Sequence, residues 1–394
     1  MMNPGISRRG LLRGSLAGAC SVAAHPWLST MSFASAPWDA RLVVIILRGA
    51  MDGLDAVQPY GDPLLAGYRP NLEVGPDNGA FDLDGYFAMH ARFGPLRDMW
   101  QRGELGFAHA VSTPYRDKRS HFDGQDLLEA GTAEIGDGTR DGWLNRFLQA
   151  MPGVEGDTAF AVGNDEMRVL EGRAPARRWA PEVDVTLTPQ AQLLLGQVYA
   201  QDALFGPAAT EGMALAEAID RQKLPPLPGG DKRDPLAAFA ANRLRGDTRI
   251  AAYSLNGWDS HQGQGRVIGR ALDTLVRSVL TLEDELGGIW AKTAVLAMTE
   301  FGRTARENGS KGTDHGTGGA MLLAGGALRG GAVYGRWPGL AEADLYARRD
   351  LMPTADVRSY AAWAMRGLYG IDRSLLERTV FPGLQMGDDP RLVA

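Results

Sequence analysis

The stretch from Leu42 to Gly53 reads LVVIILRGAMDG, and it decides the fold class. Its first half, Leu42–Leu47, is an uninterrupted run of apolar and mostly β-branched residues. Such a run is typical of a strand buried on both faces in a parallel sheet. Its second half is a glycine-flanked loop that ends in Asp52 and Gly53. Because sites in open parallel sheets form where strands end, Asp52 is the first candidate functional residue.

Further apolar runs alternate with amphipathic segments along the rest of the chain. The periodicity predicts helices over 87–101, 120–130 and 267–285. The first is broken or started near Pro95, and the second is stopped by Gly131. Alternation of strands and helices predicts an α/β fold with a mostly parallel central sheet. The other predicted strands are 104–110, 158–162, 249–255, 293–298 and 320–324.

The middle of the chain has a different composition. Residues 188–222 are rich in alanine and leucine at helical spacing and predict two helices, and the proline- and glycine-rich segment 224–230 predicts a linker. We therefore expect one α/β domain over residues 37–394, with a helical insertion at about 188–230.

The N-terminus has the layout of an export signal. Arg8 and Arg9 precede a small, apolar run at 14–24, and Ser32 and Ala34 form an A-x-A-like cleavage site. The paired arginines resemble a twin-arginine (Tat) signal, and the apolar run is too short to span a bilayer. We expect a signal peptide within residues 1–36, cleavage after Ala34, the Tat translocase as a partner during export, and a periplasmic or secreted mature chain without a stable membrane span. The alternative interpretation of this segment is a basic amphipathic helix.

Charge and cysteine content exclude several classes of function. The chain has 41 Lys and Arg against 47 Asp and Glu, a net charge of -6, and it contains no basic run, so nucleic-acid binding is not expected. Loss of Arg8, Arg9 and Arg13 with the signal leaves 38 cations against 47 acids, or -9. The single cysteine, Cys20, lies in the signal, which excludes thiolate ligands and a cysteine nucleophile in the mature chain.

Acids and histidines directly follow the predicted strands. The carboxyl ends of parallel strands meet at one edge, so we expect Asp52 and Glu300 to share a cleft and to face His261 or His315. Oxygen and nitrogen donors without cysteine suit a hard or borderline divalent ion: zinc, manganese, magnesium or calcium. His121, near Asp123, is a further functional candidate. The predicted metal ligands are Asp52, Asp259, His261, Glu300, Asp314 and His315.

Each candidate also has a purely structural interpretation, and the residue pattern alone does not choose between the two. His90 and His109 fit structural roles better than functional ones. The structural alternatives are a turn at Asp52, a helix cap at Asp259 and His261, a cap at His121 for Asp123 or Asp126, and an ion pair of Glu300 with Arg303 or Arg306.

Three runs carry a resemblance to a known family. They are LRGAMDGLDAVQPYGDP, STPYRDKRSHFDGQDLLEAG followed by DGWLNR, and MTEFGRTARENGSKGTDHGTGGAMLLAGG. Together they resemble the Tat-exported family known as domain of unknown function 1501, over nearly the whole mature chain. That family is similar to the sulfatase and alkaline-phosphatase superfamily. The resemblance implies a three-layer α/β/α sandwich and a site of strand-end acids and histidines around one or two divalent metals.

The resemblance also implies roles for individual residues. The sequence departs from the superfamily pattern in two places. Asp259 and His261 are two positions apart rather than four, and Phe301 replaces a histidine. The absence of a Cys-x-Pro-x-Arg motif excludes a formylglycine sulfatase. The implied roles are a first-strand metal aspartate for Asp52, a nucleophile at Ser120 or His121, a metal pair for Asp259 and His261, a strand-end metal acid for Glu300 and the last metal histidine for His315.

Two functions from different classes follow. The first is a metal-dependent hydrolase of phosphate or sulfate esters, acting on a small-molecule or polysaccharide substrate. In it Ser120 attacks the ester, and Arg119 or Arg303 neutralises the transferred charge. The second is a non-catalytic exported protein that binds a ligand, polysaccharide or partner on the same scaffold, which the missing second histidine favours. A redox enzyme is disfavoured because no G-x-G-x-x-G follows a strand.

Overall fold

The computed structural model describes residues 38–134, 140–180 and 233–394. Its centre is a nine-stranded mixed sheet in the order β11-β5-β10-β9-β1-β8-β6-β7, with β12 also paired to β5. The strands are β1 (Arg41–Leu47), β5 (Leu105–Ser112), β6 (Ala159–Val162), β7 (Arg177–Trp179), β8 (Ile250–Leu255), β9 (Thr293–Thr299), β10 (Gly319–Ala324), β11 (Val333–Tyr334) and β12 (Ala355–Asp356).

The predicted strand Leu42–Leu47 is confirmed as the centre of this sheet. It pairs in parallel with β8 on one side and β9 on the other, with Ile45 opposite Tyr253 and Ala297. All six predicted apolar strands are present, and β9, β1, β8, β6 and β7 run parallel. The exception is β10, which runs antiparallel to both β9 and β5.

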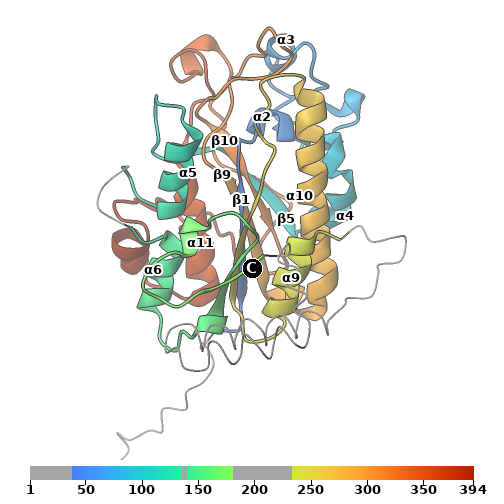
Figure 1. The fold of residues 1–394 in the computed structure, drawn as a ribbon. Helices are drawn as coiled ribbons and strands as arrows, with labels where there is room; N and C mark the ends of the chain where they lie inside the picture. Colours follow the sequence, from blue (N-terminus) through green and yellow to red (C-terminus); the bar gives the residue numbers. More distant parts are fainter. Residues whose placement is uncertain (1–37, 135–139, 181–232) are drawn as a thin grey trace, which may run out of the picture.

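Helices cover both faces of the sheet, as Figure 1 shows, which confirms the three-layer α/β/α arrangement. Alternate residues of β1 supply the two cores: Val44 packs in the cluster that includes residues of α6 and α11, and Val43 packs in the cluster that includes residues of α9 and α10. The helices are α2 (Gly53–Ala56), α3 (Leu65–Tyr68), α4 (Arg97–Gln101), α5 (His121–Ala130), α6 (Trp143–Ala150), α9 (Pro235–Leu244), α10 (Gln264–Leu286), α11 (Val357–Tyr369) and α12 (Arg373–Leu375).

The helix predicted over 87–101, broken or started near Pro95, is confirmed as an α-helix only after Pro95. That stretch contains β4 (Ala88–Met89), a 3₁₀ helix (Ala91–Leu96) and only then α4. Pro95 has no N–H to donate inside a helix, and the His90 side chain caps the 3₁₀ helix by accepting from the backbone N–H of Arg92. β4 also joins a small second sheet with β2 (Val57–Gln58) and β3 (Phe81–Asp82).

The predicted export signal and the predicted insertion at about 188–230 lie outside the described residues, so both stay predictions. Within the part of the chain that the structure describes, none of the helices has the length and apolar composition needed to cross a membrane.

The topology brings one end of many strands to a single edge. β1, β8 and β9 are parallel, and β5 runs in the same direction because it is antiparallel to the antiparallel β10. The loops that follow these four strands therefore meet the loop that precedes β10. This edge, at the top of Figure 1, collects the segments that carry the predicted site residues.

His109, on β5, gives the fold a pH dependence. Burial lowers its pKa to about 4, and the ring bridges the Val57 carbonyl (2.9 Å) and the Ala110 N–H (2.8 Å). The unfolded chain binds this proton near pH 6.5, whereas the folded chain binds it only near pH 4. The free energy of unfolding should therefore fall by about 3 kcal/mol as the pH falls through this window.

The measurement is urea unfolding at several pH values, with chelator present. His109→Gln keeps an amide donor and acceptor but does not titrate, so its stability should decline less between pH 6.5 and 4. Equal declines for the two proteins would show that His109 does not contribute this pH dependence.

Candidate metal centre

Three side chains meet at the carboxyl edge of the sheet and place ligand atoms close together. His121, Asp259 and His315 each contribute one atom, and these atoms lie within 4.8 Å of one another. His261 is adjacent: its Nε2 lies 3.1 Å from Asp259 Oδ1 and 3.0 Å from His315 Nε2. We call these four side chains the His–Asp cluster. Their segments are the start of α5, the loop after β8 and the loop before β10.

His121 is oriented by the strand-end acid of β9. Its Nδ1 lies 2.8 Å from Glu300 Oε1, so the ring donates its Nδ1–H to the carboxylate and its Nε2 carries the lone pair. That Nε2 is buried, lacks a hydrogen-bond partner, and lies 3.6 Å from Asp259 Oδ2. Phe301 stacks on the ring, with centroids 5.3 Å apart and planes at 19°. The hydrogen bond to Glu300 raises the pKa of His121, which makes Nε2 a stronger base.

His315 is held by a backbone carbonyl. Its Nδ1 lies 2.8 Å from the carbonyl oxygen of Arg119, which assigns the Nδ1–H donor and leaves the Nε2 lone pair 3.4 Å from Asp259 Oδ1. Burial lowers the pKa of His315, so the ring is neutral near pH 7. Arg119 adopts a left-handed backbone, with φ of 53°, in the loop that presents this carbonyl.

His261 is held in the same way as His121 and His315, by an acceptor at its Nδ1. Its Nδ1 lies 3.0 Å from Asp314 Oδ1, and the Asn308 side chain donates to the same oxygen at 3.1 Å. The Nε2 of His261 lies 3.0 Å from the Nε2 of His315. A cation bound by both nitrogens would account for this close approach.

The distances suit a first-row divalent ion. Ligand atoms about 2.0–2.2 Å from a tetrahedral ion lie roughly 3.3–3.6 Å from one another. His121 Nε2 lies 3.6 Å from Asp259 Oδ2 and His315 Nε2 lies 3.4 Å from Asp259 Oδ1, both within this range, whereas His261 Nε2 is closer to Oδ1, at 3.1 Å. In each histidine the Nδ1 is bound by an acceptor, which is the usual support of a metal-binding imidazole. His121, Asp259 and His315 therefore fit a single divalent ion with mixed nitrogen and oxygen ligands, and His261 lies next to them.

Arg303 fixes Asp259, the acid of the His–Asp cluster. Its guanidinium is fully buried and donates to Asp259 Oδ1 at 2.6 Å and to the carbonyl oxygens of Gly49 (2.7 Å) and Ala50 (2.8 Å). Burial raises the pKa of Asp259, but the Arg303 contact and the neighbouring imidazoles outweigh it, and the net pKa is lowered. Asp259 is thus ionised at neutral pH and fixed in place.

Glu300 supports the cluster from beneath. It is fully buried, and its carboxylate accepts from Gly49 N (2.9 Å), Gln125 Nε2 (3.1 Å) and Thr299 Oγ1 (2.9 Å) in addition to His121. Burial raises its pKa, but the hydrogen bond from His121 and those from the other donors produce a net lowering. The prediction that Glu300 faces His261 or His315 is wrong, because this carboxylate faces His121.

Two glycines allow the ligand loops to pack together. A Cβ on Gly312 would lie 2.3 Å from the carbonyl carbon of His261, and a Cβ on Gly316 would lie 2.3 Å from that of Arg303. Neither position accommodates a larger residue without backbone movement. The glycine-rich sequence around His315 therefore serves close approach of backbone to backbone.

Asp52 lies outside the group of ligand atoms. It is buried and ion-paired with Arg69, with Nη1 to Oδ2 at 2.9 Å and Nη2 to Oδ1 at 3.0 Å, and it accepts from Gln264 Nε2 at 2.7 Å. It also caps α2 by accepting from Leu54 N. These donors occupy both carboxylate oxygens, so the structure favours the turn-forming interpretation and not the expected approach of Asp52 to His261 or His315. Asp314, also predicted as a ligand, contacts His261 from the Nδ1 side.

The structure places the four predicted catalytic residues in different surroundings. The Ser120 hydroxyl caps α5 by accepting from Asp123 N at 3.4 Å. The half-buried Arg119 guanidinium lies 3.5 Å from Asp350, whereas Arg303 is buried beneath Asp259. His121, predicted as a nucleophile candidate, lies in the His–Asp cluster instead.

Sequence reasoning missed three supporting residues. Gln125 donates to Glu300, Asn308 to Asp314, and Arg349 to the carbonyl oxygen of His315 at 3.0 Å. Gln125 lies one helical turn after His121 on α5, so helical spacing places both residues on one face. This spacing is the one sequence signal that could have identified a supporting residue.

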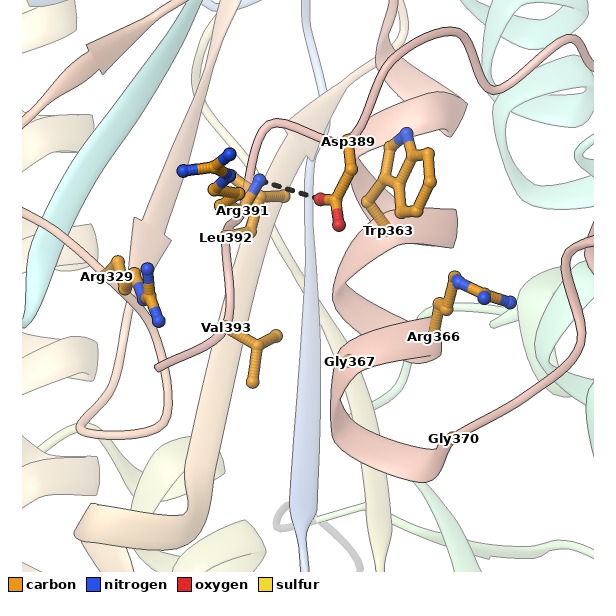
Figure 2. A pocket seen from close by; sticks show the side chains of 9 residues that line it. All are labelled: Arg329, Trp363, Arg366, Gly367, Gly370, Asp389, Arg391, Leu392 and Val393. Atoms are coloured by element: carbon orange, nitrogen blue, oxygen red, sulfur yellow. Dashed lines mark hydrogen bonds between the residues drawn. The ribbon is translucent and has the colours of Figure 1, made fainter.

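A separate cavity of about 360 Å³ lies where α11 ends and the chain approaches its C-terminus. Since α11 starts beside the carboxyl end of β5, its last turn lies at the edge opposite the His–Asp cluster. Figure 2 shows Arg366 and Arg391 pointing in opposite directions around it. Arg366 also donates to the carbonyl oxygen of Ile371 at 2.8 Å, as a C-terminal cap does. Arg329 and Asp389 also line this cavity, so its walls carry three arginines and one aspartate.

Fold and cluster together define an α/β/α protein with a histidine–aspartate site at the carboxyl edge of its sheet. Residues 107–375 match the family described as protein of unknown function (DUF1501), and the chain belongs to that family. No curated protein sequence matches it.

Several solved structures align with low similarity. They are the lipoteichoic acid synthase LtaP from Listeria monocytogenes (10% identity, 90% of this chain and 78% of that one, TM-score 0.37) and an alkaline phosphatase superfamily protein from Vibrio parahaemolyticus (12%, 89% and 73%, 0.34). A third is the C-terminal periplasmic domain of EptC from Escherichia coli in complex with zinc (10%, 92% and 93%, 0.38).

Proposed function

We propose that this protein is a divalent-metal-dependent hydrolase of phosphate or sulfate esters. The observation that carries the proposal is the convergence of three Nε2 atoms on Asp259, each from a histidine whose Nδ1 is bound by an acceptor. One ion held by His121, Asp259 and His315, with His261 beside it, fits this arrangement, and zinc is the ion that such a donor set favours. The chemistry that a bound ion supplies is Lewis-acid polarisation of an ester oxygen.

The exposure of the cluster supports access by a substrate. The side chains of Asp259 and His261 are 48% and 40% exposed, whereas His121 and His315 are 24% and 18% exposed. The buried members fix the geometry, and the exposed members leave one side open to an incoming ester.

The charges around His315 suit an anionic substrate. Arg119 and Arg349 both approach the buried Asp350, at 3.5 Å and 3.0 Å, so two half-exposed guanidiniums share one carboxylate. Burial also raises the pKa of Asp350, although both arginines lower it. This excess of positive charge beside the cluster would neutralise a phosphate or sulfate group.

Ser120, one residue before His121, is the nucleophile in this proposal. Its Oγ forms a bond to phosphorus or sulfur as the bond to the alcohol oxygen breaks, and the alcohol leaves with the serine proton. Water then releases the phosphate or sulfate and restores the hydroxyl.

The test uses the mature protein loaded with zinc or manganese and assayed with 4-nitrophenyl phosphate and 4-nitrophenyl sulfate. Ser120→Asn keeps an N-cap for α5 but removes the hydroxyl, so it should lower kcat by about 1,000-fold while the metal content stays unchanged. Ser374→Ala, a serine on α12, is the matched control and should retain full activity.

Full activity in Ser120→Asn would exclude Ser120 as the nucleophile. Bound metal without hydrolysis of either ester would instead favour the second candidate, a non-catalytic binding protein. The observation behind that candidate is Phe301, which is buried between Tyr115 and His121 and fills the position of the histidine that the superfamily pattern expects.

A further inference from the structure

Phe122 is an unusual residue for its position. Among the described residues, only Leu64 and Phe122 are large hydrophobic side chains exposed to solvent, at 38% and 84%. Phe122 is therefore by far the more exposed, and it lies in the first turn of α5, directly after His121. Leaving an aromatic ring in water forgoes the stabilisation that burial would give, and nothing in the contacts of α5 requires a phenylalanine there.

The surroundings of Phe122 link it to the site. His121 supplies the buried Nε2 of the His–Asp cluster, and Arg119, on the loop that enters α5, presents its carbonyl to His315. Residues 119–122, at the entry to α5, thus carry a cation, a cluster imidazole and a solvent-exposed ring. With 84% of its side chain exposed, Phe122 is available to a ligand whose anionic group binds the cluster and whose remainder reaches the start of α5.

We propose that Phe122 binds the ring of the alcohol part of the substrate, and that the substrates are phosphate or sulfate esters of ring-bearing alcohols. The inference rests on the proposed function, whose ester group it places at the cluster. The shared chemistry is a flat ring with an apolar face, which an aromatic ring and a sugar ring both present to an aromatic side chain. Phe122 is then a specificity residue, separate from the groups that carry out the reaction.

Binding of phosphonates, which are not hydrolysed, tests this inference without requiring turnover. Titration calorimetry on the zinc-loaded protein compares phenylphosphonate with methylphosphonate. Phe122→Ala should weaken phenylphosphonate binding about tenfold, because one ring contact is lost, and should weaken methylphosphonate binding far less. Phe122→Trp should restore the phenylphosphonate affinity. Leu64→Ala removes the other exposed hydrophobic side chain and should leave both affinities unchanged.

Equal weakening of both phosphonates by Phe122→Ala would indicate a structural role in α5 and overturn the inference, as would no weakening of phenylphosphonate, methylphosphonate or glucose 1-phosphate binding. Glucose 1-phosphate, titrated in the same way, separates the two ring sources: dependence on Phe122 for it alone indicates a sugar, and dependence for phenylphosphonate alone indicates an aryl group. A different result would refute the proposed function: the metal-loaded wild type would not hydrolyse 4-nitrophenyl phosphate or 4-nitrophenyl sulfate.

Discussion

Replacing His315 by alanine is expected to abolish tight metal binding while the sheet stays folded. His315 contributes one of the converging Nε2 atoms, and it lies in a loop rather than in the hydrophobic core. Loss of groups that merely support a metal ligand costs about 10–100-fold in affinity, so loss of a ligand should cost at least about 100-fold. Zinc titration against a competing chelator measures this affinity.

Thermal unfolding provides a second measurement. An ion present at 100 times its dissociation constant stabilises the folded state by about 2.7 kcal/mol, so zinc should raise the Tm of the wild type and a chelator should reverse the change. His315→Ala should show neither response. His90→Ala is the matched histidine replacement outside the cluster and should respond as the wild type does. A wild type that neither binds zinc nor responds to it would refute the metal centre itself.

Asp52→Ala is expected to destabilise the fold strongly without weakening the metal site. Asp52 and Arg69 form a fully buried ion pair at 2.9 Å, and the substitution leaves the guanidinium charged and without its carboxylate. Breaking a buried pair from one side costs about 3–5 kcal/mol. Urea unfolding in the presence of a chelator measures this loss apart from any contribution of bound metal.

The double variant Asp52→Asn with Arg69→Met removes both charges and should recover part of the stability lost in Asp52→Ala. Zinc affinity of the folded Asp52→Asn protein should equal that of the wild type. A large loss of zinc affinity in that variant would instead support the sequence-based assignment of Asp52 as a metal ligand.

Local pattern was sufficient to predict the sheet and most of the cluster. Apolar runs such as Leu42–Leu47 mark buried strands, and the position of His261 and His315 next to strand ends placed them at one edge. The antiparallel direction of β10 was not predictable in this way, because an apolar run has the same composition in either direction.

The partners of individual acids were beyond the reach of sequence patterns. Asp52 and Glu300 both follow buried strands, yet one accepts from Arg69 and the other from His121. Arg69 comes from a loop and His121 from a helix, and only the packing of those segments decides which acid each one meets. For the same reason His121 was open to interpretation as a nucleophile or a helix cap.

The arrangement of β9 and β10 has a consequence for how the site forms during folding. Glu300 and His315 belong to one connection between neighbouring strands, whereas His121 and the Asp259–His261 segment arrive from distant parts of the chain. A folding intermediate in which only β9 and β10 have paired would hold a single histidine of the cluster. High-affinity zinc uptake should therefore appear late in refolding, after β5 and β8 have joined the sheet. The time at which zinc is taken up would then report when the sheet is complete.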